Sequence, residues 1–411
     1  MKILYSTGIS LYGTAVRMAA AKNPKAAQMV AGHKVVFDYL KENRKAGDRY
    51  LWFHAASLGE FEQGRPLIEE IRRSYPQYKI ALTFFSPSGY EVRKNYAGAD
   101  LICYLPLDTP ANVNRFLDLL QPEKAFFIKY EFWANYLNAL HKRHIPVYLF
   151  SAIFRPEQVF FRWYGNFFRR LLNVYDCIFV QDVPSANLLR NIGISQIETA
   201  GDTRFDRVGE ICRQAKELPL IARFREGASF VMVAGSSWPK DEDILIDHFN
   251  RHPEMKLIIA AHEIHESHLA EIIGKLKRPY VRYSELTEAN AAQAHCLIID
   301  CIGLLSSVYR YGDAAYIGGG FGVGIHNVLE AAVYGIPVLF GPNYGKFREA
   351  RELIARKGAF SIKNQEQYDS LTDSLMSDAA FCGKSGKLAG SYVEANAGAT
   401  RTILERVFRK K

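Results

Sequence analysis

The chain has 411 residues, which is long for a single hydrophobic core, so two domains are expected. Hydrophobic residues make up 48% of the chain and charged residues 23%, and this balance excludes a largely disordered protein. The net charge of +9 indicates an anionic partner, which nucleic acid, acidic lipid or a phosphorylated substrate would each satisfy. The six cysteines lack metal-ligand spacing, and we expect reduced, buried thiols in a cytoplasmic protein.

The N-terminal stretch is a candidate membrane-associating helix. Residues 4–16 are uncharged and mostly small or apolar, and Arg17, Lys22 and Lys25 follow them. The stretch is shorter than the ~20 residues that a spanning helix needs. We expect no cleavable signal peptide. A helix lying on the membrane surface and an ordinary surface helix both fit the pattern.

Short apolar strands alternate with helices in the first half of the chain. Strands are predicted at 50–55, 79–84, 101–105, 125–129, 146–150 and 177–180. Helix-start signals follow them, as at Asp108-Thr109-Pro110, where a capping side chain precedes a proline near the first turn. This alternation predicts a doubly wound parallel sheet.

The same pattern restarts after a polar, irregular segment at 201–224. Strands are predicted at 230–234, 256–260, 280–283, 296–300, 314–317 and 337–340. We therefore expect two similar α/β domains, 1–206 and 207–390, with a cleft between them. The terminal segment 391–411 contains a predicted helix, about 391–409, that is a candidate to cross back onto the first domain.

A glycine-rich stretch, 314–342, is the strongest candidate for a ligand site. A short strand breaks into a loop with glycines at 318, 319, 320, 322 and 324, and a predicted helix then carries His326, Asn327 and Glu330. Glycine permits positive φ and close approach of a ligand, and a helix N-terminus there would favour a phosphate. An ordinary strand–helix turn is the alternative. Neither the Walker pattern nor the dinucleotide fingerprint of a first βα turn fits.

Ligands of such sheets bind beyond the carboxyl ends of the strands, so polar residues just after strands are candidates. In the first half they are His54, 57–60, 86–89, Asp108 and 129–131; in the second half they are Ser236, Ser237, His262, Glu263, Asp300 and 318–327.

Two carboxylates have ambiguous roles. Glu60 follows Gly59 at a strand–helix turn, where a carboxylate with a raised pKa can serve as a general base. It could equally complement the dipole of its own helix. Glu131 could be a second acid, or it could orient an arginine or a substrate hydroxyl.

Two further clusters have competing interpretations. His262, His265 and His268 are spaced by three, but no cysteine or HExxH pattern joins them, so we predict no metal site there. Residues 154–175 interleave aromatic side chains with arginines, including Arg155 and Arg162. They form either a core helix with solvated arginines or a surface for acyl chains and phosphates, and the number of aromatic residues favours the surface.

Several short motifs occur in a fixed order: HAASLGE at 54–60, SPSGY at 86–90, YLPLD at 104–108, EFWAN at 131–135, GDTRFD at 201–206, GSS at 235–237 and GIHNVLE at 324–330. Each is weak alone, but the series resembles the 3-deoxy-D-manno-octulosonic acid (Kdo) transferases of lipopolysaccharide assembly. The match runs from about residue 50 to residue 350. The chain departs from the usual family pattern at 129–131, Arg204, 260–263 and 324–326.

The resemblance implies an α/β GT-B fold, with two Rossmann-like domains whose parallel sheets face a central cleft. It implies inverting transfer of Kdo from CMP-Kdo to the lipid A precursor, lipid IVA, at the cytoplasmic face of a Gram-negative inner membrane. The partners would be these two substrates and an anionic membrane surface, with no cofactor, metal or nucleic acid. The alternatives are another GT-B sugar transferase or epimerase that uses a UDP-sugar, and a protein that only binds its ligand.

The resemblance also implies roles for individual residues. Glu60 would be the general base, and Glu131 a second catalytic residue. The donor-binding residues would be Ser236, Ser237, His262, Glu263, Gly320, Gly322, Gly324, His326, Asn327 and Glu330. The acceptor-binding residues would be Ser57, Ser86, Ser88, Gly89, Asp108, Arg155 and Arg162.

Overall fold

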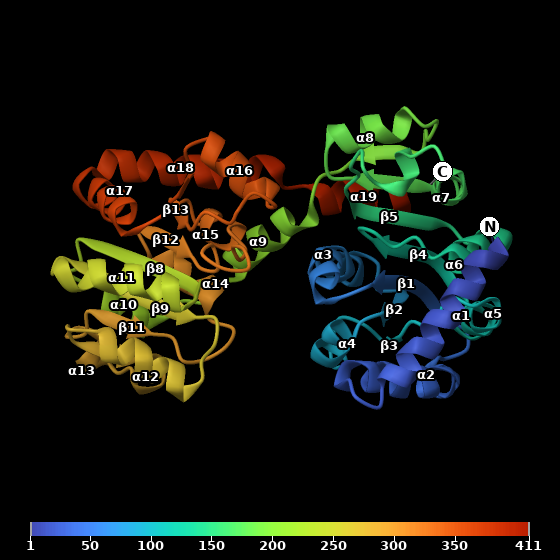
Figure 1. Cartoon of the computed structure of the whole chain (residues 1–411), viewed down its shortest axis with the longest axis horizontal. Helices are drawn as coiled ribbons and strands as arrows, with labels where there is room; N and C mark the ends of the chain where they lie inside the picture. Colours follow the sequence, from blue (N-terminus) through green and yellow to red (C-terminus); the bar gives the residue numbers. More distant parts are fainter. Residues whose placement is uncertain (1, 410–411) are drawn as a thin grey trace. The chain divides into compact units, whose positions relative to one another are not determined.

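The computed structural model describes residues 2–409 and contains two compact units. The first unit is Met1–Arg207 with Ala397–Lys411, and the second is Val208–Asn396. Each contains a seven-stranded sheet in which the paired strands are parallel (Figure 1). The α/β class with parallel sheets is therefore confirmed. Residues 1, 410 and 411 of the predicted terminal segments lie outside the described residues.

The sheet of the first unit has the order β3-β2-β1-β4-β5-β6-β7. Its strands are β1 Arg49–Ala55, β2 Tyr78–Phe84, β3 Leu101–Tyr104, β4 Pro122–Ile128, β5 Val147–Ala152, β6 Cys177–Val180 and β7 Ile197–Thr199. The strand order reverses between the neighbours β1 and β4. Such a reversal leaves a crevice beyond the carboxyl ends of the two strands, so the loops after β1 and β4 are placed to bind a ligand.

Helices cover both faces of this sheet. They are α1 Lys2–Ala19, α2 Pro24–Asn43, α3 Leu58–Ser74, α4 Pro87–Arg93, α5 Pro110–Leu120, α6 Ala134–Lys142, the 3-10 turn Val159–Phe161, α7 Asn166–Leu172, α8 Val183–Arg190 and α19 Ala399–Phe408. In β1, Tyr50 and Trp52 pack with α2, α5 and α6, whereas Leu51 and Phe53 pack with α3 and α19. Burial of both faces explains the nearly continuous apolar sequence of this strand.

The chain enters the second unit through α9 Thr203–Gln214 and returns to the first unit after α18. The single helix predicted over 391–409 is wrong: α18 ends at Asn396 and α19 begins at Ala399. Gly398 separates them with φ 112°, a left-handed conformation that glycine adopts without a steric penalty. The Asp206 carboxylate accepts the backbone N–H groups of Gly398 and Thr400, at 2.5 and 2.7 Å.

The sheet of the second unit has the order β10-β11-β9-β8-β12-β13-β14. Its strands are β8 Phe230–Ser237, β9 Met255–Ala261, β10 Tyr280–Arg282, β11 Cys296–Ile298, β12 Ala314–Ile317, β13 Val338–Phe340 and β14 Ala359–Ser361. Its helices are α10 Pro219–Arg225, α11 Pro239–Arg251, α12 Glu266–Lys275, α13 Glu288–Ala291, α14 Leu305–Val308, α15 Leu329–Ala332, α16 Arg348–Ala355, α17 Gln365–Ser377 and α18 Ala379–Asn396, with 3-10 turns at Tyr283–Glu285 and Tyr309–Tyr311. The strand order reverses between the neighbours β8 and β12, as it does between β1 and β4 in the first sheet.

One face of the second sheet is covered by α11, α12 and α17. Leu245 and Phe249 from α11, Leu269 from α12 and Leu375 from α17 share a buried cluster with the strands. Helices α11 and α17 also contact each other directly. Residues far apart in the sequence are thereby held together along this face.

The aromatic stretch 154–175 is only partly a surface. Phe154 and Phe160 are each 4% exposed and pack against Phe132, so the surface interpretation is wrong for them. Trp163 and Tyr164 are 90% and 57% exposed, and for them it stays a prediction. The thiols are free, as expected, but Cys301 is exposed rather than buried.

Candidate functional site

The first candidate site lies where β1 ends and α3 begins. Ser57 precedes the helix, and Glu60 lies in its first turn, partly exposed. The Ser57 hydroxyl does not cap the helix; it donates to the Glu60 carboxylate instead. This contact fixes the direction of the carboxylate, while the helix N-terminus also favours its charge. Location alone therefore still permits both roles predicted for Glu60.

Glu131, after β4, is held on several sides. Its side chain is 8% exposed, and Oε2 lies 3.1 Å from His54 Nε2 and 2.5 Å from Trp133 Nε1, which donates to it. His54 Nδ1 in turn lies 2.9 Å from Thr83 Oγ1. The Tyr175 hydroxyl donates to the Glu131 carbonyl at 2.5 Å. Glu131 is thus an anchored carboxylate, better suited to holding the loop after β4 than to exchanging protons with a substrate.

Tyr130, in the loop after β4, interacts electrostatically with Glu60. Burial raises the pKa of the Tyr130 phenol, and the charges of Arg155 and Glu60 also act on it. Lys129 precedes it with φ 69°, a strained conformation for a residue with a side chain, and its Nζ lies 5.4 Å from the Tyr130 ring centroid. Arg155 is exposed after β5, and its charge acts on the same phenol as that of Glu60.

The turn after β2 packs against the Glu60 turn. Ser86 caps α4 by accepting the Ser88 N–H at 3.2 Å, and the two hydroxyls lie 2.9 Å apart. A Cβ at Gly89 would fall 2.4 Å from the Phe84 side chain and 3.1 Å from the backbone carbon of Ser57. Gly89 therefore permits close packing of the two turns, and the serines lie beside Ser57.

Asp108, a predicted acceptor-binding residue, has its carboxylate engaged inside the first unit. It is 1% exposed; Oδ2 accepts the Tyr5 hydroxyl at 2.8 Å and the Asn135 N–H at 3.0 Å, and Oδ1 accepts the Tyr136 N–H at 2.9 Å. Burial raises the pKa of this carboxyl to about 6. Asp108 joins α1 to α6. Arg162 is exposed, and its Nε donates to the Glu157 carbonyl at 3.3 Å.

The second candidate site lies at the end of β8. Ser236 has φ 52° and is partly exposed, a strained conformation at a strand end. Ser237 is 1% exposed, and its hydroxyl donates to Glu242 at 2.9 Å. Glu242 also pairs with His268 Nε2 at 3.0 Å. The Ser237 hydroxyl is therefore already engaged inside the unit, and donor binding by this residue stays a prediction.

The glycine-rich loop differs from its prediction. Helix α15 spans only Leu329–Ala332, so His326 and Asn327 precede it, and no long helix supplies a dipole to a phosphate. The loop is instead held by its backbone, with Gly318 N–H donating to the Gly235 carbonyl at 2.9 Å and His326 N–H donating to the Gly318 carbonyl at 3.2 Å.

The glycines of this loop serve different purposes. A Cβ at Gly320 would lie 2.5 Å from the Gly341 nitrogen, so this glycine is required for backbone packing rather than for donor contact. Gly324 has φ 120°. A Cβ at Gly322 would approach nothing closer than 3.9 Å, so this exposed glycine has room for a ligand.

The Asp241 carboxylate holds the glycine-rich loop in place. Its carboxylate accepts the Gly319 N–H at 2.9 Å, the Tyr316 hydroxyl at 2.8 Å and the Trp238 N–H at 3.0 Å. Asp241 is 1% exposed, and burial raises the pKa of its carboxyl. One side chain from α11 therefore joins β12, the glycine-rich loop and the turn after β8.

Three flat rings meet at the carboxyl ends of β8, β9 and β12. The rings of Trp238 and His262 stack with centroids 4.6 Å apart, and His326 lies 4.6 Å from His262. Trp238 Nε1 donates to His326 Nε2 at 3.2 Å. Burial, with the charge of His262, lowers the pKa of His326 and so favours the neutral ring that can accept this bond. Sequence reasoning missed Trp238, because an aromatic residue after a strand has no polar signature.

The remaining predicted donor residues border this ring cluster. Glu263 is exposed next to His262. Asn327 accepts the Leu329 N–H at 3.2 Å and donates to Glu330 Oε1 at 3.0 Å. Asn327 therefore starts α15 and orients the Glu330 carboxylate. The second site offers a stacking surface, two imidazole rings and a carboxylate, which suit a nucleotide-linked sugar.

Residues 30–207 match the family described as 3-deoxy-D-manno-octulosonic-acid transferase (kdotransferase). A 3-deoxy-D-manno-octulosonic acid transferase from Aquifex aeolicus is 28% identical over 86% of this chain and 94% of its own length. One from Bordetella pertussis is 27% identical over 86% of each chain. Over most of its length the chain is therefore similar to the Kdo transferases.

The chain shares its fold with enzymes of known structure. UDP-GlcNAc 2-epimerase from Neisseria meningitidis, bound to UDP-GlcNAc, superposes with a TM-score of 0.62 at 14% identity, over 88% of this chain and all of the epimerase. MurG from Acinetobacter baumannii gives 0.56 at 12% identity, over 88% and 100%. The fold is GT-B. The similarity to Kdo transferases supports a glycosyltransferase, and the solved structures show the fold alone.

Proposed function

We propose that this protein is a Kdo transferase that moves Kdo from CMP-Kdo to a hydroxyl of lipid IVA, with inversion at the anomeric carbon. The observation that carries the proposal is the Glu60 turn at the β1–β4 reversal, where the Ser57 hydroxyl orients a partly exposed carboxylate. The names of the relatives support transfer of Kdo, and the net charge of +9 supports a phosphorylated acceptor.

In this reaction Glu60 takes the proton of the acceptor hydroxyl as its oxygen attacks the anomeric carbon. The bond from that carbon to the CMP phosphate breaks, and CMP leaves with the electron pair. Glu131 is a positioning residue in this scheme, because His54 and Trp133 already occupy its Oε2. Arg155, exposed near Tyr130, would meet an acceptor phosphate.

The donor would bind the second unit. Its base would stack on the rings of Trp238, His262 and His326, and Glu330 would accept hydroxyl groups of the sugar. Backbone N–H groups around Gly322, together with Ser236, would face the phosphate and stabilise the charge that develops on CMP. On this proposal the reaction itself requires no metal.

The donor proposal predicts selective protection by CMP. We expect CMP to raise the thermal unfolding temperature in the presence of a chelator, and UDP to raise it less. His326→Ala should weaken CMP binding, because Trp238 loses its hydrogen-bond acceptor and the ring cluster loses a member. His265→Ala, an exposed histidine outside the cluster, is the matched control. Calorimetric titration measures both variants. Protection by UDP alone would replace CMP-Kdo with a UDP-sugar as the donor.

The overall reaction is tested by incubating the protein with CMP-Kdo and lipid IVA. Release of CMP and a mass increase of the lipid by one or more Kdo units would support the proposal. Release of CMP without a mass increase would indicate hydrolysis, and neither change would reject the donor–acceptor pair.

We also propose that α1 attaches the enzyme to the cytoplasmic face of the inner membrane. Within residues 2–409 no helix is long and apolar enough to cross a membrane. Helix α1 nevertheless exposes large apolar side chains, namely Ile3, Leu4, Leu11 and Met18. An apolar surface of this kind, followed by Arg17, suits the interface of an anionic bilayer.

The attachment proposal predicts binding to vesicles that contain anionic phospholipid. Replacing Leu4 and Leu11 with serine should reduce the bound fraction severalfold, and high salt should weaken binding of the parent by screening its basic residues. Ile302→Ser, at a 90% exposed residue of the second unit, is the control. Equal sedimentation of all three proteins with vesicles would remove α1 from the attachment.

A further inference from the structure

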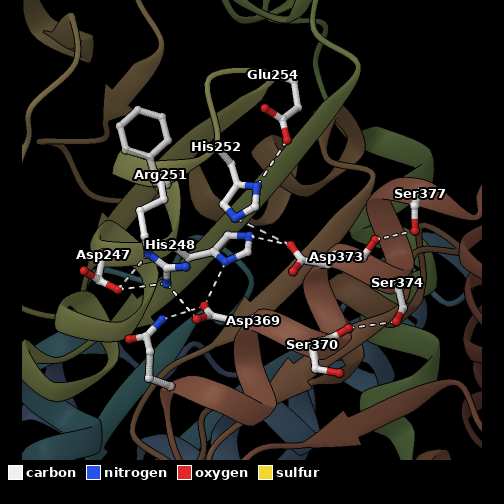
Figure 2. Close-up of polar contacts among 12 residues, drawn as sticks. Asp247, His248, Arg251, His252, Glu254, Asp369, Ser370, Asp373, Ser374 and Ser377 are labelled. Atoms are coloured by element: carbon white, nitrogen blue, oxygen red, sulfur yellow. Dashed lines mark hydrogen bonds and ion pairs between the residues drawn. The ribbon is translucent and has the colours of Figure 1, made fainter.

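Three potential metal ligands meet between α11 and α17, away from the ring cluster. His248 lies on α11, His252 follows the end of that helix, and Asp373 lies on α17. One ligand atom from each lies within 4.8 Å of the other two. Figure 2 shows both imidazole rings directed toward the Asp373 carboxylate. The two histidines are four residues apart, the spacing that places side chains on one helix face.

The distances fit a small divalent cation. His248 Nε2 and His252 Nε2 lie 3.7 and 3.6 Å from Asp373 Oδ1. Tetrahedral Zn²⁺ with bonds of about 2.0–2.1 Å separates its ligands by roughly 3.4 Å. The two His–Asp distances are within a few tenths of an ångström of this value, and the stacked rings of His248 and His252, with centroids 4.0 Å apart, would turn to direct both nitrogens at a common ion.

The buried side chain of His248 has one nitrogen without a hydrogen-bond partner. His248 is completely buried, and its Nε2 has no hydrogen-bond partner. Asp373 Oδ1, at 3.7 Å, is too far to accept a hydrogen bond from it. A buried polar atom without a partner costs about 1–3 kcal/mol, so an unpaired nitrogen directed at a carboxylate needs an explanation. A bound cation supplies one.

The second nitrogen of each imidazole is already oriented by a carboxylate. His248 Nδ1 lies 2.8 Å from Asp369 Oδ1, and His252 Nδ1 lies 3.2 Å from Glu254 Oε1 (Figure 2). Metal-binding histidines are commonly oriented in this way, because the carboxylate fixes the ring and leaves the other nitrogen for the ion. Arg251 donates to Asp369 at 2.7 Å and balances part of the negative charge.

We propose that His248, His252 and Asp373 bind a divalent transition-metal ion, Zn²⁺ by preference, that joins α11 to α17. Two imidazoles and one carboxylate suit Zn²⁺ better than Mg²⁺ or Ca²⁺, which prefer oxygen ligands. The Asp373 side chain is 51% exposed, so the ion has an entry path and water can complete its coordination. The role is structural and independent of the proposed Kdo transfer, which requires no metal.

The test is Zn²⁺ titration of the full chain after treatment with a chelator and its removal. We expect one ion per chain by calorimetry and a visible absorption spectrum of tetrahedral type when Co²⁺ replaces Zn²⁺. At a hundredfold excess over Kd, Zn²⁺ should raise the Tm of the second unit by roughly 5–10 °C. Binding of fewer than one ion, or no Co²⁺ spectrum, would overturn the proposal.

Asp373→Asn and His252→Gln are the decisive variants, because both side chains are at least partly exposed and neither substitution should prevent folding. Each should lower the Zn²⁺ affinity by 10-fold or more, since one of three protein ligands is lost. Asp247→Asn is the matched control: this exposed carboxylate contacts Arg251 beside the cluster without being a ligand (Figure 2). Equal Zn²⁺ affinity in all variants would place the ion on other surface histidines and refute the site.

Discussion

Glu60→Gln is expected to lower kcat for Kdo transfer by roughly 10²–10⁴-fold, the contribution of a positioned general base. Glutamine keeps the size of the side chain and can still contact the Ser57 hydroxyl, but it cannot take a proton from the acceptor. Thermal stability should change little, because loss of helix-dipole complementarity costs about 0.3–1 kcal/mol. CMP affinity, measured by calorimetry, should equal that of the parent.

Glu62→Gln is the control for this experiment. Glu62 lies on the same helix and pairs with Arg93 at 2.7 Å, so its substitution also removes one negative charge from α3. Its kcat should stay within a few-fold of the parent. If Glu60→Gln folds normally and transfers Kdo at the parental rate, Glu60 only complements its helix dipole. Glu131, although anchored, would then be the next candidate.

Asp241→Ala should lower the free energy of unfolding of the second unit by roughly 3–5 kcal/mol, because two buried donors and one partly buried donor lose their acceptor. These donors are the Gly319 and Trp238 N–H groups and the Tyr316 hydroxyl. The Gly319 loop and the Trp238 ring would both lose their support, so CMP binding should fall with stability. Urea denaturation followed by tryptophan fluorescence measures the change.

Asp243→Ala provides the comparison on the same helix. The Asp243 side chain is 60% exposed and pairs with Lys275 at 2.6 Å, a surface contact worth about 0–1 kcal/mol. A stability loss as small in Asp241→Ala as in Asp243→Ala would show that the loop holds its conformation without the buried carboxylate.

The sequence predicted the sheets well where strands are long or buried. The bounds of β6 and β12 match the predicted residues, and the other central strands differ by a few residues. The edge strands β7 and β14 were missed, since three residues carry too little periodicity. The break between α18 and α19 was missed too, because Gly398 interrupts an otherwise helical pattern whose stop depends on contact with Asp206.

The sequence predicted where the candidate site residues lie relative to the strands, but it did not predict which of their side chains are buried. Ser57 and Glu60 follow β1 as expected, whereas Ser236 and Ser237 are the last two residues of β8. The Asp108 and Ser237 side chains are buried against hydrogen-bond partners, Tyr5 far away in the sequence and Glu242 on the next helix. The cluster of His248, His252 and Asp373 has no sequence signature, because packing of α17 against α11 brings the carboxylate to the histidines.

Helix α19 has a consequence for the order in which the protein can fold. Ile403 and Val407 complete the buried cluster between α3 and the first sheet, yet the ribosome makes them only after the whole second unit. At about 5–20 residues per second, that delay lasts on the order of 10–40 s. During synthesis Ile68 and Ile71 therefore remain partly uncovered, and the second unit is complete while the first still awaits its last helix. A nascent chain in this state is a natural client for a chaperone.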